Sequence, residues 1–284
     1  MQLGRIREIW RYPVKSMGGE TLECTAVEER GLPGDRIWAV RDEVRGGIRG
    51  AKKIAPLMRC KARLGGAPEA GAPEITLPSG ECFAADAADA AERLGTALGQ
   101  PVTLWPLLPA DCLDHYRRGK PTHSDVLTEL RSVFALDPGE PLPNFSAFPR
   151  DLLQYESPPG TYFDAFPILL LTTATLRRLQ AAAPASRVDV RRFRPNFVID
   201  TPAGFDGYAE PGWVGRRLRI GGALVEATAG CPRCVMITRG FDDLPEDSAL
   251  MRAVVRDAGH EIGVYAKVLE PGAVSVGDAA ELVD

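Results

Sequence analysis

The sequence is poor in the residues that build metal and disulfide frameworks. Its 284 residues include three histidines and six cysteines, and six cysteines are too few for a disulfide scaffold in a chain of this size. We therefore expect free thiols in a reducing compartment. Long hydrophobic runs are also missing, and Arg5, Arg7 and Arg11 occupy the N-terminus where a signal peptide needs an apolar stretch. These absences predict a cytoplasmic protein that does not bind a membrane.

An excess of charge of one sign is absent too. The sequence has 34 lysines and arginines against 38 acidic residues, a formal charge of −4, without a block of like charge. This balance argues against a nucleic-acid partner, and any anion site must be local. A hydrophobic content of 45% and a charged content of 25% predict a soluble globular chain of one large domain or two small ones.

Short strands are expected in the first hundred residues. Alternation over residues 21–31 places Leu22, Cys24 and Ala26 on one face, and residues 74–85 turn at positions 78–80. Short strands with tight turns favour a barrel or a sandwich. One helix interrupts them over residues 85–99, where alanine-rich composition, an acidic first turn and the closing Gly99 agree.

Residues 105–167 are rich in proline and lack long periodic runs. We predict ordered loops there, with one short helix over residues 126–134, because aromatic residues recur along the segment and favour order. A long ordered connection of this kind is usually functional. The segment is therefore predicted to form a wall of the active cleft.

The remaining sequence is expected to mix helices and strands. Residues 172–183 and 246–259 predict helices, the first with a threonine N-cap and the second closed by Gly259. Residues 216–230 predict a hairpin with a two-residue glycine turn, whose second strand runs into Cys231. Residues 262–283 predict a final hairpin turning at Pro271 and Gly272. Residues 189–200 predict a strand pair, or one strand broken at Pro195.

Two cysteines, Cys231 and Cys234, are separated by two residues. Structural zinc needs four ligands, yet the other cysteines are scattered singly and the histidines form no ligand pair. A thioredoxin-like pair needs a helix starting at the first thiol, but β-branched and apolar residues follow this one. By itself the segment is typical of buried small side chains at a strand end.

Two further segments carry groups that suit an anion. They contribute Lys15 and Ser16 after the Tyr12-Pro13 turn, and Arg191, Arg192, Arg194 and Asn196 in the second half. Each segment alone is typical of a solvated surface. Together, arginine forks and a lysine with a hydroxyl are the groups that hold phosphate. A cysteine beside such cations is expected to have a lowered pKa and to suit a soft, high-valent metal.

Four motifs in a fixed order now point to a family. They are "YPVKS" at 12–16, "GLPGDRIWAV" at 31–40, "FRPN" at 193–196 and "CPRC" at 231–234. With them the chain resembles the MOSC proteins that carry an N-terminal MOSC β-barrel region, the amidoxime-reducing enzymes among them. The resemblance implies a mixed α and β fold, mainly β, with a β-barrel-type MOSC domain over residues 121–284 packed with a β-rich domain over residues 1–120.

The resemblance also implies a molybdenum cofactor of the Mo-molybdopterin type. Matched position by position, Cys234 would be the catalytic residue and the protein ligand to molybdenum. The pterin and its phosphate would be held by Lys15, Ser16, Arg36, Arg194 and Asn196. Cys231 lies where some relatives have serine, so its thiol is not required.

The activity implied is that of an oxidoreductase that reduces small N-hydroxylated substrates, amidoximes or hydroxylamines, by oxygen-atom transfer. Asp164 and Asp206 are candidate proton donors. The sequence ends without the clustered cysteines of an iron–sulfur domain, so a separate electron-donor protein is expected.

The sequence departs from the family pattern in two places. Ala165 and Phe166 replace a Thr-Ser pair and remove two side-chain donors to the cofactor. Residues 236–245 replace the usual segment after the second cysteine and alter a wall of the cleft. Both departures leave the substrate open.

Two other functions are weighed against the oxidoreductase. The first is a molybdenum-cofactor or sulfur-carrier module without turnover, because the family takes its name from a cofactor sulfurase. A complete sulfurase needs a pyridoxal-phosphate domain that 284 residues cannot hold, so pyridoxal phosphate would be a family-level label only. The second alternative is a zinc or thiol-redox protein built on Cys231 and Cys234.

Overall fold

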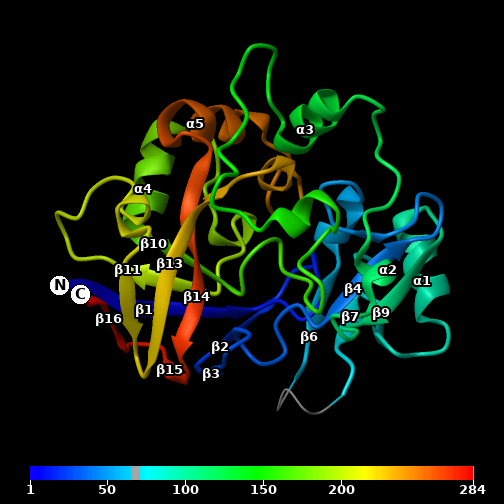
Figure 1. Cartoon of the computed structure of the whole chain (residues 1–284), viewed down its shortest axis with the longest axis horizontal. Coiled ribbons are helices and arrows are strands. Elements are labelled where there is room, and N and C mark those ends of the chain that lie inside the picture. The colour runs from blue at the N-terminus through cyan, green and yellow to red at the C-terminus, as the bar shows by residue number, and fades with distance from the viewer. Residues whose placement is uncertain (66–70, 284) are drawn as a thin grey trace.

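A closed β-barrel forms one side of the molecule. The computed structural model describes residues 1–65 and 71–283, and within them seven strands close on themselves (Figure 1). Their order around the barrel is β1 (Gln2–Arg11), β11 (Phe197–Asp200), β10 (Ile168–Thr172), β14 (Glu261–Glu270), β13 (Ala223–Pro232), β12 (Arg217–Ile220) and β16 (Ala279–Val283). Neighbouring strands are antiparallel except β10 and β11. The fold is therefore mainly β, as the sequence predicts.

Strand β1 closes the barrel. It pairs with β11 and with β16, so the first residues of the chain complete a wall built from strands of the second half. Leu3, Ile6 and Ile9 are buried in the barrel core with apolar residues of the other strands. These three side chains are three positions apart, because two register shifts in the pairing of β1 interrupt the strict alternation of a strand.

The parallel pair β10 and β11 needs a crossover, which helix α4 (Thr173–Ala182) supplies. Thr172 caps the helix by accepting a hydrogen bond from the Thr175 backbone N–H at 3.1 Å, which confirms the predicted threonine cap. The buried Glu210 carboxylate also accepts the Thr172 N–H at 2.7 Å. Figure 1 shows α4 and helix α5 (Ser248–Ala258) together over one end of the barrel.

The N-terminal region lies beside the barrel and contains two small sheets. One comprises β5 (Ile48–Arg49), β4 (Trp38–Asp42) and β9 (Val102–Pro106), and the other β6 (Lys61–Arg63), β7 (Glu74–Thr76) and β8 (Cys82–Ala84). Helix α1 (Ala90–Leu98) and the 3-10 turn η1 (Ala55–Arg59) pack on them. Their core also takes in Met236, Phe241 and Leu244 from the second half, so the two regions share apolar contacts. The division at residue 120 stays a prediction.

The segment between the two regions has little regular structure. It contains α2 (Leu113–Tyr116), α3 (Val126–Phe134) and the 3-10 turn η2 (Arg150–Leu153). Its contacts reach both sides: Glu129 pairs with Lys53 of the N-terminal region, and Glu140 pairs with Arg252 of α5 at 2.6 Å. The predicted ordered loops and the helix over 126–134 are confirmed.

Smaller elements complete the fold. They are β2 (Glu20–Leu22), β3 (Cys24–Val27), β15 (Gly272–Ser275) and the 3-10 turns η3 (Val190–Arg192), η4 (Glu210–Trp213) and η5 (Val235–Thr238). The predicted glycine hairpin is confirmed, because Ile220 pairs with Ala223 across Gly221 and Gly222. Helix ends at Gly99 and Gly259 are also confirmed, since both glycines adopt the left-handed conformation.

Two strand predictions are wrong. The final hairpin does not form, because β15 leaves β14 at Pro271 and pairs with β3. The turn η3 replaces the first part of the strand predicted over residues 189–200, with Asp189 as its cap, and β11 begins only after Pro195. Cys24 and Ala26 share one face of β3, as the alternation predicts, and that face is exposed.

No helix within residues 1–65 and 71–283 combines the length and apolar character that crossing a bilayer requires.

Gly4 gives a test of barrel closure. A Cβ at this position would overlap the Asp200 carbonyl oxygen of β11, and that backbone cannot withdraw without opening the β1–β11 pairing. We expect Gly4→Ala to lower the free energy of unfolding by about 2 kcal/mol or more, as overpacked sites do. Gly212→Ala is the matched control, because a Cβ there has open space around it. Equal denaturant midpoints for the two variants would contradict this account of closure.

Candidate functional site

The sequence motifs meet because one row of paired residues crosses the barrel wall. The pairs are Ile9 with Phe197, Phe197 with Leu170, Leu170 with Val264, and Val264 with Gly230. The row lies within three residues of Tyr12, next to Asn196 and next to Cys231. Motifs that are nearly two hundred positions apart in the sequence therefore meet at one rim of the barrel.

A cavity opens at this rim. Its lining includes Arg36, Asp164, Arg194, Asn196, Cys231, Arg233, Cys234 and Tyr265, with Phe166, Leu169, Arg192, Phe193, Pro232, Met236 and Ile237. Four arginines face a single carboxylate among these residues. Such a cavity attracts an anion, although the whole chain is acidic.

The CPRC segment is fixed by its arginine. Arg233 is buried and donates to the carbonyl oxygens of Phe193 at 2.8 Å and Ile262 at 2.9 Å, and its backbone N–H donates to His260 at 2.8 Å. Cys231, the residue before Pro232, is buried beside Tyr265. Cys234 begins the turn η5 and is half-buried. The two cysteines thus occupy different environments.

Asn196 of the FRPN segment holds strands together. Its side-chain oxygen accepts the Leu169 N–H at 3.1 Å, and its amide nitrogen donates to the Trp10 carbonyl at 3.3 Å and to Asp35 at 3.1 Å. Strands β1 and β10 are linked through this one buried amide. The side chain reaches the cavity wall with its hydrogen-bonding groups already engaged.

Arg36 and Arg194 lie on the ring of Tyr12. Their Cζ atoms are 5.1 and 4.2 Å from the ring centroid. Arg36 donates to the buried Asp35 carboxylate and, at 3.3 Å, to the Arg194 carbonyl. Arg194 donates through Nη1 to the Met17 carbonyl, while its buried Nη2 has no partner within the described part of the chain. A buried donor of this kind is unusual in a folded protein.

Backbone strain also gathers at this rim. Ser16, Arg36 and Arg194 adopt left-handed φ values of 68°, 52° and 57°. Non-glycine residues rarely do so, and held strain of this type is concentrated at functional sites. The three residues are among the five that the family resemblance implies for cofactor binding.

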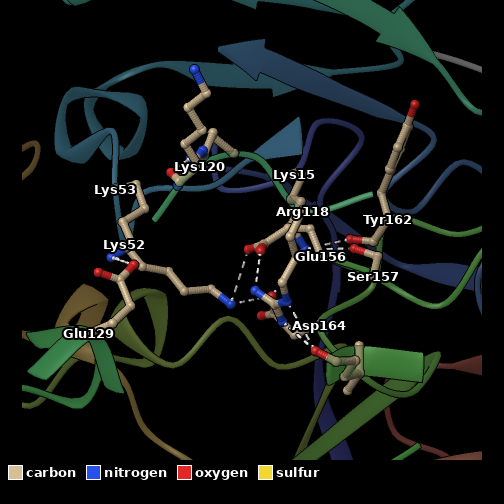
Figure 2. Close-up of polar contacts among 12 residues, drawn as sticks. Lys15, Lys52, Lys53, Arg118, Lys120, Glu129, Glu156, Ser157, Tyr162 and Asp164 are labelled. Carbon is tan, nitrogen blue, oxygen red and sulfur yellow. Dashed lines mark hydrogen bonds and ion pairs between the residues drawn. The ribbon is translucent and has the colours of Figure 1, made fainter. Parts of the chain in front are cut away.

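Lys15 is buried and pairs with the segment that covers the cavity. Its ammonium lies 2.9 Å from the Tyr162 carbonyl, 3.0 Å from Asp164 and 3.3 Å from both the Phe163 carbonyl and the Ser157 hydroxyl (Figure 2). Four protein oxygens thus surround a group with three donors. The predicted wall of the cleft is held in place by this lysine.

Lys52 joins the same network, and the sequence analysis missed it. Its ammonium lies 3.5 Å from Glu156 and 3.7 Å from Asp164, and Glu156 also pairs with Arg118 at 2.5 Å (Figure 2). Burial alone would raise the pKa of Asp164, but Lys15 and Lys52 outweigh it and hold this pKa well below its usual range. Lys52 carries no motif, so only the folded chain reveals it.

The expected lowering of the cysteine pKa is wrong for the chain alone. Burial raises the pKa of Cys234 above its ordinary value, and the nearby Lys52 ammonium offsets only part of the effect, while Asp164 adds to it. Arg233 lowers this pKa too, but its influence is weaker than that of Lys52. Desolvation is therefore the stronger influence here.

Other predicted residues have structural roles. Arg192 is buried and donates to four backbone carbonyls, those of Arg187, Ile237, Arg239 and Pro245. Arg191 pairs with Asp189 at 2.8 Å and Asp243 at 3.0 Å. Asp206 is exposed in the loop after β11.

Phe166, at one of the two departures from the family pattern, adds an aromatic wall. Its ring lies 5.6 Å from Tyr265 and 5.9 Å from Phe148, centroid to centroid. No group of three or more His, Cys, Asp or Glu side chains suited to a metal ion occurs within residues 1–65 and 71–283.

The fold and the rim define a β-barrel protein with a cavity at one end that is lined by four arginines and one half-buried thiol. Residues 158–281 match the MOSC domain, and residues 3–102 match the MOSC N-terminal beta barrel domain. The chain belongs to the MOSC domain family. Its site lies where residues of both matched regions meet.

Curated relatives match nearly the whole chain. Mitochondrial amidoxime-reducing component 1 of Mus musculus is 27% identical over 99% of this chain and 83% of its own length. The Homo sapiens protein of the same name is 26% identical over 99% and 84%, respectively. Mitochondrial amidoxime reducing component 2 of Bos taurus is 24% identical over 98% and 82%.

The two cysteines of the CPRC segment give a labelling test. Burial raises the pKa of Cys231 to about 11, so this thiol stays protonated and unreactive at pH 8, whereas Cys24, Cys82 and Cys112 are exposed. Peptide mapping after iodoacetamide treatment should find the exposed cysteines labelled first. Cys60, buried with a pKa of about 11, is the matched control. Labelling of Cys231 at the rate of Cys112 at pH 8 would refute its assigned environment.

Proposed function

We propose that the chain is a molybdenum-cofactor-dependent oxidoreductase that reduces small N-hydroxylated compounds, with Cys234 as the protein ligand to the metal. One observation carries the proposal. A half-buried thiol and a buried guanidinium donor that has no partner among residues 1–65 and 71–283 line the same cavity, at the meeting point of the family's motifs. A ligand that joins a soft metal to a phosphate group suits both.

The residues present fit such a cofactor. Arg194 offers Nη2, and Arg36 adds a second guanidinium on the same aromatic ring. These two would hold the phosphate, because planar guanidinium forks match its oxygens. Ser16 lies at the same rim with a left-handed backbone, and we assign it to the pterin side of the ligand.

Lys15 and Asn196 take a supporting part in this proposal. Their polar groups already bind protein atoms, so they would shape the cofactor pocket by fixing the wall at Tyr162–Asp164 and strands β1 and β10. Such supporting contacts commonly orient the groups that touch a bound metal or cofactor.

The bound group would supply oxygen-atom transfer with two electrons, and the chain would supply placement and charge. Asp164 is held ionised by Lys15 and Lys52, so in this proposal it fixes those two lysines and is not the proton donor. Lys52 remains protonated, because Glu156 and Asp164 raise its pKa. Its positive charge beside Cys234 would stabilise the sulfur in its deprotonated, metal-binding form.

The cavity limits how the cofactor enters. It encloses about 50 Å³, whereas pockets for ligands of this size span roughly 300 to 1,000 Å³. Wall side chains must therefore move on binding. The Asp164 side chain is half exposed, and movement of this side chain would require breaking its contacts with Lys15 and Lys52.

The relatives' names support the substrate class. Three curated proteins that match nearly all of this chain are named for reducing amidoximes. Their identities of 24 to 27% leave the particular substrate of this chain as a proposal. A separate electron-donor protein and a cytoplasmic location stay predictions.

Metal content tests the role of Cys234. Protein purified from a host supplied with molybdenum should contain molybdenum and pterin, and Cys234→Ala should lose the metal because its only proposed protein ligand is gone. Cys231→Ser, the matched variant, should keep it. Elemental analysis with pterin fluorescence makes both measurements. Zinc at one per chain without molybdenum would exclude the proposed cofactor.

Turnover separates the enzyme from a cofactor carrier. Molybdenum-loaded protein with a reduced viologen dye should convert an amidoxime to the amidine, and a hydroxylamine to the amine. The product is measured by chromatography, with Cys234→Ala as the control. Loaded protein that converts neither compound would favour the carrier function, in which the same residues would hold the cofactor without turnover.

A further inference from the structure

Tyr12 contacts an unusual number of charged groups for a buried tyrosine. Its ring is stacked on Trp10, with centroids 6.1 Å apart and planes 11° apart. It also contacts Arg36 and Arg194 within 5.1 and 4.2 Å of its centre. Its backbone N–H donates to Asp35 at 2.7 Å. The residue thus contacts both of the arginines that are proposed to bind the phosphate, and the carboxylate that pairs with one of them.

The two guanidiniums carry like charges, so an attractive interaction must hold them close together. Burial and the charge of Arg36 lower the pKa of Arg194 to about 10, so it remains protonated at neutral pH and repels its neighbour. Asp35 directly pairs with Arg36. Both arginines also hold left-handed backbones. A shared aromatic face attracts cations, and this attraction strengthens when water is excluded.

The tyrosine hydroxyl allows the role of the ring to be tested apart from that of hydrogen bonding. It is buried and has no hydrogen-bond partner within the described residues. Replacing Tyr12 by phenylalanine therefore breaks no hydrogen bond of the chain, whereas replacing it by an aliphatic residue removes the aromatic face. Few buried tyrosines offer so clean a comparison.

We propose that Tyr12 is a positioning residue of the anion site, whose ring holds Arg36 and Arg194 side by side so that they bind one phosphate group. The proposal rests on the proposed function only for the identity of the larger molecule that carries the phosphate. Cation–π contact here organises the ligand-binding charges, and the ligand itself need not touch the ring. Loss of the ring should separate the two guanidiniums and weaken phosphate binding as much as loss of one arginine.

The test measures binding of inorganic phosphate to the full chain, produced in a host that cannot make the molybdenum cofactor, by titration calorimetry. We expect Arg194→Ala and Tyr12→Leu each to weaken binding about tenfold, the loss of one charge-assisted contact. Tyr12→Phe should stay within about twofold of the unaltered chain, because the ring remains. Tyr12→Met is a second ring-free variant with an adaptable side chain.

Tyr116→Leu controls for the loss of a buried tyrosine elsewhere. Tyr116 is as buried as Tyr12 and lies in the separate cluster with Tyr155 and Tyr162, so its replacement should lower stability and leave phosphate affinity unchanged. Cooperative thermal unfolding establishes that each variant is folded.

Three results would overturn the proposal: no phosphate binding by the unaltered chain, full affinity in the folded ring-free variants, or equal losses in Tyr12→Phe and Tyr12→Leu. The proposed function fails separately. If phosphate binding depends on the ring, but protein purified from a host supplied with molybdenum contains none, the role of Tyr12 is supported and the molybdenum enzyme is refuted.

Discussion

The pairing of β1 with β11 is the constraint on which the site depends. It brings Ile9 opposite Phe197, and the same row continues through Leu170 and Val264 to Gly230. Backbone hydrogen bonds therefore set the distance between the N-terminal motif, the FRPN segment and the CPRC segment. A slip of one residue in β1 would turn its buried face outward and separate the motifs. The closed barrel removes the free edges that would allow such a slip.

The hydrogen-bond partners of three arginines at this rim separate those with a structural role from the one that is available to a ligand. Arg192 and Arg233 donate to backbone carbonyls, so their charge is solvated by the protein itself. Arg194 differs, because one of its buried nitrogens lacks a partner among the described residues. Backbone carbonyls satisfy a guanidinium as well as a ligand does. Among the arginines of this rim, Arg194 therefore has a donor that is available to an anion.

The sequence predicted those features that depend on neighbouring residues. Helices over 126–134 and 246–259 and the hairpin at Gly221 follow from caps, periodicity and turn chemistry. The order of four motifs also identified the family. Pairing between distant strands could not be predicted in this way. The sequence pattern suggested β14 as the partner of β15, but β15 pairs with β3, which lies near the N-terminus. Local patterns do not contain that choice.

The electrostatics of the site were harder to predict from the sequence than the residues that form it. Lys52 belongs to no motif, and its place beside Cys234 arises because the loop after β5 packs against the Glu156–Asp164 wall. The sequence analysis expected cations to lower the pKa of the cysteine. Lys52 and Arg233 do lower it, but desolvation outweighs them. Residue type alone does not fix such an outcome, because burial and partners decide the sign.

The polar groups of the rim divide into two sets with different duties. Lys15 and Asn196 use their hydrogen bonds on the protein, joining the covering segment and two barrel strands. Arg36 and Arg194 retain a surplus of positive charge over the single Asp35 that contacts them. The first set makes the second possible, since like charges stay close only in a rigid setting. Both sets follow from the same motifs, and a motif residue can therefore serve the site without touching the ligand.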